Sequence, residues 1–104
     1  MLEKEIERYF VKKAKQRKCL CYKFVSPGNA GVPDRIIITP WGETVYVELK
    51  TPTTDLRPLQ RAVHERIRHQ NAMVFTLHDR DEVDQFFEVI FSEVCTETIP
   101  EICY

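Results

Sequence analysis

The sequence has no long apolar run, no internal repeat and no low-complexity segment. No segment has the roughly 18 consecutive apolar residues of a membrane-spanning helix. The first residues, MLEKEIERYF, are charged and have a helical pattern, unlike a signal peptide. We therefore expect no contact with a membrane and a cytoplasmic location, in a bacterium or in the host cell if a phage encodes the chain.

The sequence also lacks a cysteine pattern for zinc or for disulfides. Cys19 and Cys21 are separated by one residue rather than two, and no second pair follows at zinc-finger spacing. A reducing compartment disfavours disulfide bonds. We expect the cysteines to be buried or half-buried free thiols.

The composition is that of one small globular domain, but its charge is unevenly distributed. The 104 residues are 43% hydrophobic and 30% charged, with a net charge of −1. Residues 1–78 contain 14 lysines and arginines against 8 acids, whereas residues 79–104 contain one arginine against 8 acids. The basic part is suited to a polyanion, with the acidic tail turned away.

Hydrophobic periodicity predicts seven elements in the order α-β-β-β-α-β-α. The three expected helices are 3–18, 58–70 and a last helix capped by Asp79 or Asp81. The four expected strands are 19–25, 35–39, 44–50 and 72–77. The turn PWGE joins the second and third strands into an antiparallel hairpin. The order predicts a single α/β domain with a mixed sheet flanked by helices.

The second expected helix has an apolar stripe and one of the three histidines of the chain. The stripe consists of Leu59, Ala62, Val63 and Ile67. The histidines, which share no metal-ligand spacing, are His64, His69 and His78. We expect the histidines at the surface or at helix ends.

Charged residues occur where a small core is expected, in GVPDRIIITPWGETVYVELK. Asp34 begins one strand, and Glu48 and Lys50 end the next. Because side chains alternate along a strand, Glu48 and Lys50 point the same way while Leu49 points into the core. If the hairpin turns at the centre of PWGE, Asp34 lies opposite about residue 49. Asp34 and Glu48 are therefore expected to converge.

These groups suit phosphodiester hydrolysis. Two carboxylates and a backbone carbonyl form a hard-oxygen site of the kind that magnesium accepts. Water on such an ion loses a proton more easily. A nearby lysine can orient or deprotonate that water, or stabilise negative charge on a phosphoryl oxygen. Short motifs such as ExK also occur as exposed ion pairs, so the interpretation depends on the combined arrangement.

The motifs GVPDR, VELK and RPLQRAVHERIR resemble the VRR-NUC (virus-type replication-repair nuclease) family of the PD-(D/E)XK superfamily. The resemblance extends from about residue 3 to residue 87. It implies a restriction-endonuclease-like core, with a nuclease domain at residues 1–93 and a C-terminal tail at 94–104.

The resemblance also implies roles for individual residues. Asp34, Glu48 and the Leu49 carbonyl would be metal ligands, Lys50 the catalytic lysine, and Gln60 a catalytic-site glutamine. The expected ion is Mg²⁺, for which Mn²⁺ can substitute, with no small-molecule cofactor.

Family members place a further glutamate on the first helix. Glu3 is the first choice because it shares the core-facing side with Ile6 and Phe10. Glu7 is the second choice and Glu5 the third. All three also suit the first turns of a helix, where the helix dipole favours negative charge.

The expected function is that of a magnesium-dependent endodeoxyribonuclease in DNA repair. Small members of the family resemble resolvases that act as symmetric dimers on branched DNA such as four-way junctions. Alternatives are cleavage of flap, single-stranded or duplex DNA, or a catalytically silent DNA-binding module. Candidate phosphate contacts are Lys23, Arg35, Arg57 and Arg61. A dimer seam is predicted from Phe86, Phe87, Ile90, Phe91 and the tail.

Overall fold

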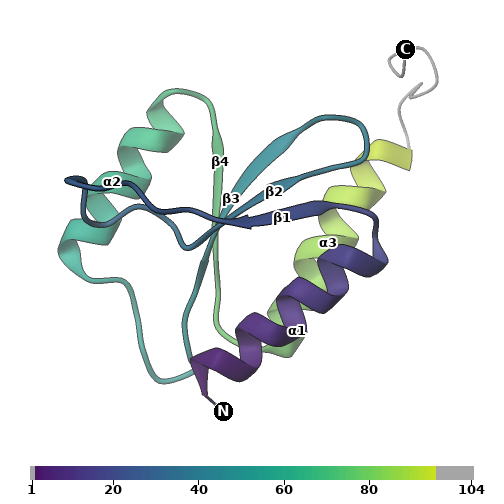
Figure 1. Cartoon of the computed structure of the whole chain (residues 1–104), viewed down its shortest axis with the longest axis horizontal. Coiled ribbons are helices and arrows are strands. Elements are labelled where there is room, and N and C mark those ends of the chain that lie inside the picture. Colours follow the sequence, from purple (N-terminus) through teal and green to yellow (C-terminus); the bar gives the residue numbers. More distant parts are fainter. Residues whose placement is uncertain (1, 96–104) are drawn as a thin grey trace.

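The computed structural model describes residues 2–95 of the chain, with side chains through residue 92. Its elements are α1 (Glu3–Gln16), β1 (Leu20–Lys23), β2 (Arg35–Ile38), β3 (Thr44–Leu49), α2 (Pro58–His69), β4 (Met73–Leu77) and α3 (Arg80–Cys95) (Figure 1). The predicted element order and α/β class are confirmed. Among the described residues, no helix is both long and apolar enough to cross a membrane.

The four strands form one mixed sheet in the order β1-β2-β3-β4. The first three strands are mutually antiparallel, and β4 pairs parallel to β3 after the α2 crossover. Helices α1 and α3 lie side by side on one face of the sheet, and α2 lies apart from them, beyond the other face (Figure 1). The sheet thus separates a two-helix layer from a single helix.

The hydrophobic core fills the space between the sheet and the α1–α3 layer. Its buried side chains are Ile6, Phe10, Ala14, Cys19, Ile37, Val45, Val47, Leu49, Leu77, Val83, Phe86, Phe87 and Ile90. Alternation along β3 sends Val45, Val47 and Leu49 into this core, as predicted, and leaves Glu48 on the α2 side.

The expectation that apolar residues of α3 form a dimer seam is wrong for Phe86, Phe87 and Ile90. These three are at most 6% exposed and belong to the chain's own core. Phe91 is half-buried, and its ring packs edge-on against Trp41 with centroids 5.0 Å apart. Helix α3 packs against α1, and its Phe86 ring contacts Phe75 of β4, so its apolar residues are used within the chain. The predicted tail lies beyond the described side chains and stays a prediction.

The orientation of α2 differs from the prediction. Leu59 of the apolar stripe is 55% exposed and Ala62 is also exposed, whereas Gln60 and His64 are buried. Val63 and Ile67 are half-buried. The physical reason is the polar character of the sheet beneath α2, because a buried carboxylate there needs polar partners rather than leucine.

Gly31 brings the β1–β2 loop against α2. Its φ of +93° lies in the left-handed region, and a Cβ there would be 3.0 Å from Val63 Cγ2 and 3.1 Å from the Leu59 carbonyl oxygen. Gly28, in the same loop, has a φ of +82° but no atom within 4 Å of such a Cβ. Close packing as well as backbone conformation therefore requires glycine at position 31.

We predict that Gly31→Ala destabilises the protein by about 1–3 kcal/mol more than Gly28→Ala. Both variants have a Cβ at positive φ, but only the first one collides with α2. Urea unfolding of the two variants measures the difference. Equal losses of stability would contradict close loop–helix packing at Gly31.

Candidate active site

The hairpin register places Asp34 beside Glu48. Arg35 is paired with Val47, so Asp34, one residue earlier, lies opposite Glu48, one position from the expected partner. The Leu49 backbone N–H donates a 2.9 Å hydrogen bond to Asp34 Oδ2. The Phe24 N–H donates to the Asp34 carbonyl oxygen at 2.8 Å. Asp34 is thus held between the first and third strands.

Glu48 is a buried carboxylate with incomplete pairing. Its side chain is 2% exposed, and Lys50 Nζ lies 3.8 Å from Oε2. The Gln60 side-chain amide donates to the same oxygen at 3.2 Å. Oε1 has no hydrogen-bond partner among the described residues, although His64 Nε2 is 3.7 Å away. The Oε1 atom of Glu48 therefore has no hydrogen bond within the described residues to replace its lost contact with water.

The electrostatics of the site disfavour a charged Glu48 in the metal-free protein. Burial, and after it the neighbouring Asp34, raise the pKa of Glu48 to about 8. The Lys50 ammonium acts in the opposite direction, and Glu3 adds a smaller repulsion. A cation bound beside the two carboxylates would offset both the burial of Glu48 and its repulsion by Asp34 and Glu3.

Gln60 connects the start of α2 to Glu48. Its Oε1 accepts the Arg57 backbone N–H at 2.9 Å, which leaves the amide nitrogen for the 3.2 Å bond to Glu48. Both ends of the side chain are therefore in use, and the two contacts define its orientation. This geometry places Gln60 at the site, as the family resemblance implies.

His64 is the site residue that sequence reasoning missed. It was expected at the surface or at a helix end, and this expectation is wrong because the side chain is fully buried beside Glu48. Burial lowers the pKa of His64, so the ring is neutral near pH 7. The spacing to Gln60 was the available signal, since residues four apart share one helix face.

Two of the three first-helix glutamates, Glu7 and Glu5, accept hydrogen bonds of their own in the structure. Glu7 Oε2 accepts hydrogen bonds from Arg35 Nε at 3.1 Å and from Arg35 Nη2 at 2.9 Å. Glu5 accepts the Leu2 backbone N–H at 2.9 Å. Glu3 is exposed rather than core-facing as expected; its charge acts on Glu48, and its role at the site stays a prediction.

The four predicted phosphate contacts fall into two groups. Arg35 is occupied by Glu7, and Arg61 pairs with Asp55 at 2.7 Å. Lys23 and Arg57 are exposed and have no carboxylate partner within residues 2–92. Lys23 and Arg57 therefore remain free to contact a phosphate.

The candidate metal donors fit magnesium by their chemistry. Within the described part of the chain, no three His, Cys, Asp or Glu side chains gather as a metal site. The predicted set of metal ligands has only two such side chains, because its third donor is the backbone carbonyl of Leu49. An extended residue points its N–H and C=O to the same edge, so this carbonyl faces the Asp34 side, like the Leu49 N–H. Hard oxygens and the unpaired Glu48 Oε1 suit Mg²⁺.

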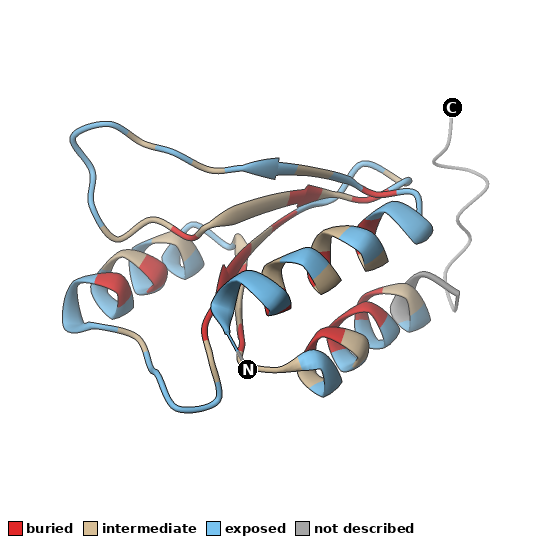
Figure 2. Cartoon of the chain, turned by 60° about the horizontal axis from the view of Figure 1, so that its bottom comes forward, coloured by how far each residue is buried: buried red, intermediate tan, exposed pale blue. Residues whose placement is uncertain are grey.

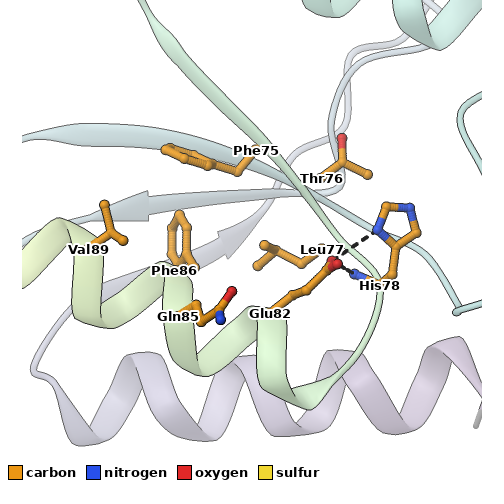
Figure 3. Close-up of a pocket in the computed structure, with 8 residues that line it drawn as sticks. All are labelled: Phe75, Thr76, Leu77, His78, Glu82, Gln85, Phe86 and Val89. Atoms are coloured by element: carbon orange, nitrogen blue, oxygen red, sulfur yellow. Dashed lines mark hydrogen bonds and ion pairs between the residues drawn. The ribbon is translucent and has the colours of Figure 1, made fainter.

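A separate hollow of about 330 Å³ lies between β4 and α3 (Figure 3). Phe75, Phe86 and Val89 contribute apolar walls, and His78 Nδ1 lies 3.0 Å from Glu82 Oε1 at one side. None of the residues assigned above to the candidate site lines it. The candidate site is therefore distinct from this hollow.

The fold and the paired carboxylates at adjacent strand ends define a nuclease-type α/β domain, and comparisons identify its family. No family model matches the chain. It is 37% identical over 79 residues to Putative nuclease p44 of Acyrthosiphon pisum secondary endosymbiont phage 1, covering 76% of this chain and 85% of that protein. A solved structure described as a VRR_NUC domain matches with a TM-score of 0.79 and 31% identity, covering 83% of this chain and 94% of that one. The chain belongs to the VRR-NUC family.

We predict that Glu48→Gln stabilises the metal-free protein by about 1–3 kcal/mol at pH 8, because a neutral amide removes the buried charge. The direction of this change in stability follows from the raised pKa of Glu48. Between the ordinary value of 4.5 and about 8, the unfolded chain releases a proton that the folded chain retains, so stability falls as pH rises.

Urea unfolding in EDTA at several pH values measures this effect. Exposed Glu43→Gln is the matched control, expected to leave the pH dependence unchanged. A Glu48→Gln variant that is less stable than the wild type at pH 8 would contradict the described electrostatics.

Proposed function

We propose that this protein is a divalent-metal-dependent endonuclease that hydrolyses phosphodiester bonds in DNA. The observation that carries the proposal is the buried Glu48 carboxylate, held beside Asp34 with one oxygen unpaired. Such an arrangement is unfavourable for folding alone, and functional sites retain unfavourable arrangements of this kind. Support also comes from the family and from the nuclease name of the phage relative.

Asp34, Glu48 and the Leu49 carbonyl would hold the ion, which we propose is Mg²⁺, with Mn²⁺ as a substitute. When bound, it would supply Lewis acidity and a more acidic water. Its charge would also offset the repulsion between the two carboxylates. Glu3, at the start of α1, is the candidate for an additional, outer contact.

The remaining site residues act on the substrate or on Glu48. Lys50 Nζ, 3.8 Å from Glu48 Oε2, would stabilise negative charge on a phosphoryl oxygen or orient the attacking water. Gln60 holds Oε2 of Glu48 by its amide. Neutral His64 faces Oε1 and limits the orientations of the carboxylate.

We propose branched DNA, with the four-way junction first, as the substrate, and DNA repair as the process. This choice follows from the family resemblance, as does the proposed homodimer, in which two sites would face opposite strands. Because Phe86, Phe87 and Ile90 are occupied in the core, a dimer would not be built on these three side chains. Cleavage of flap, single-stranded or duplex DNA is the alternative.

We expect Mg²⁺ or Mn²⁺ to support cleavage of end-labelled DNA and Lys50→Ala to abolish it without unfolding the protein. Four-way junction, flap, single-stranded and linear duplex DNA are compared, with EDTA as the control. Symmetric cuts confined to the junction would support a resolvase-like nuclease. DNA binding by a folded protein without any cleavage would overturn the proposal in favour of a binding module.

We predict that His64→Leu lowers cleavage by about 10- to 100-fold, the usual effect of losing a group that orients a metal ligand. The stability should be unchanged or higher, because leucine replaces a buried ring without hydrogen bonds. His69→Leu, an exposed position on the same helix, is the matched control. Unchanged cleavage by a folded His64→Leu protein would remove His64 from the site.

A further inference from the structure

Exposed cations follow the outer face of α1. The α1 basic stripe consists of Lys4, Arg8, Lys12 and Lys15. Their spacings of four, four and three residues place them on one side of the helix. All four are exposed and lack a carboxylate partner within the described side chains. The outward face of α1 is visible in Figure 2 as an exposed band beginning near the N-terminus.

The other flank of α1 is neutralised by α3. Lys13 Nζ lies 3.8 Å from Asp84 Oδ1, and Arg17 Nη2 lies 3.0 Å from Glu88 Oε1. The acidic C-terminal part of the sequence thus pairs with one side of α1 and leaves the stripe unpaired. Helix α1 therefore carries paired cations, which stabilise its contact with α3, and unpaired cations, which do not contribute to that contact.

Helix stability does not account for the stripe. The macrodipole favours cations only near the C-terminus, which suits Lys15. Lys4 lies in the first turn, where positive charge is unfavourable. Like charges four residues apart, such as Arg8 and Lys12, also repel each other. A bound anion would turn these unfavourable charges into favourable ones.

A second element adds to the positive charge at the middle of the stripe. Arg80, from the start of α3, joins Arg8 and Lys12 around a hollow of about 300 Å³ that Glu5 and Tyr9 also line. The Arg80 guanidinium lies 5.4 Å from the centre of the Tyr9 ring. Arginine side chains from two elements, presented at one hollow, are suited to phosphate oxygens.

The first turn of α1 carries both Glu3 and Lys4, the first residue of the stripe. Lys4 follows Glu3, whose charge acts on Glu48. From Lys4 to Lys15 the helix rises by about 16 Å. This length corresponds to about five base pairs along one strand of a duplex. A duplex arm lying along α1 could therefore contact the whole length of the stripe with one strand.

We propose that the α1 basic stripe binds the phosphate backbone of a duplex arm of the DNA substrate. This inference rests on the proposed function and extends it to a surface outside the catalytic residues. The contacts position the duplex without reading its sequence. Arg80 contributes to the same phosphate path at the hollow.

The test compares the salt dependence of DNA binding in EDTA, where no hydrolysis is expected. We expect Arg8→Gln/Lys12→Gln to reduce the slope of log affinity against log salt by about 1.8, for two lost phosphate contacts. Lys13→Gln/Arg17→Gln removes two charges from the paired flank of the same helix and should leave the slope nearly unchanged. Lys4→Gln/Lys15→Gln is an independent pair that should reproduce the loss of slope.

Equal slope changes in the stripe and flank variants would show an effect of net charge alone and would overturn the proposal. So would unchanged slopes in both stripe variants. Sedimentation without DNA tests whether acidic residues of a second copy occupy the stripe, and self-association lost only in the stripe variants would also overturn it. Cleavage of junction and duplex DNA by the wild type with magnesium is measured separately. Absence of cleavage would contradict the proposed nuclease function, whereas the salt slopes test only whether the stripe binds DNA.

Discussion

The candidate site is organised around one unfavourable interaction, the burial of the Glu48 carboxylate next to Asp34. Glu48 is 2% exposed, and its Oε1 has no hydrogen-bond partner among the described residues. Removing a carboxylate from water costs free energy unless charge and hydrogen bonds compensate it. Lys50 and Gln60 compensate only Oε2. The remaining cost explains the raised pKa of Glu48.

The surrounding fold can be understood as support for this carboxylate. The β2–β3 hairpin places Asp34 opposite Glu48, and the Leu49 N–H holds Asp34 in place. Helix α2 places Gln60 and His64 against Glu48 instead of its apolar side chains. Gly31 keeps the loop before Asp34 close to α2, so both sides of the site are anchored to the same helix.

Much of the fold could be predicted because its signals are local. Alternation in VYVELK and the turn PWGE predict the hairpin, and they place Asp34 within one residue of its observed partner. The rotation of α2 could not be predicted from its own apolar stripe, because it depends on the polar sheet face beneath it. The ion pair between Glu7 and Arg35 spans 28 residues in sequence and likewise requires the assembled fold.

The most direct test of the account is a carbon-13 NMR titration of the Glu48 carboxyl, with and without magnesium. We expect a pKa near 8 in the metal-free protein and a marked decrease when magnesium is bound, because the ion stabilises the charged form. A carboxyl that titrates near the ordinary value of 4.5 under both conditions would contradict the account.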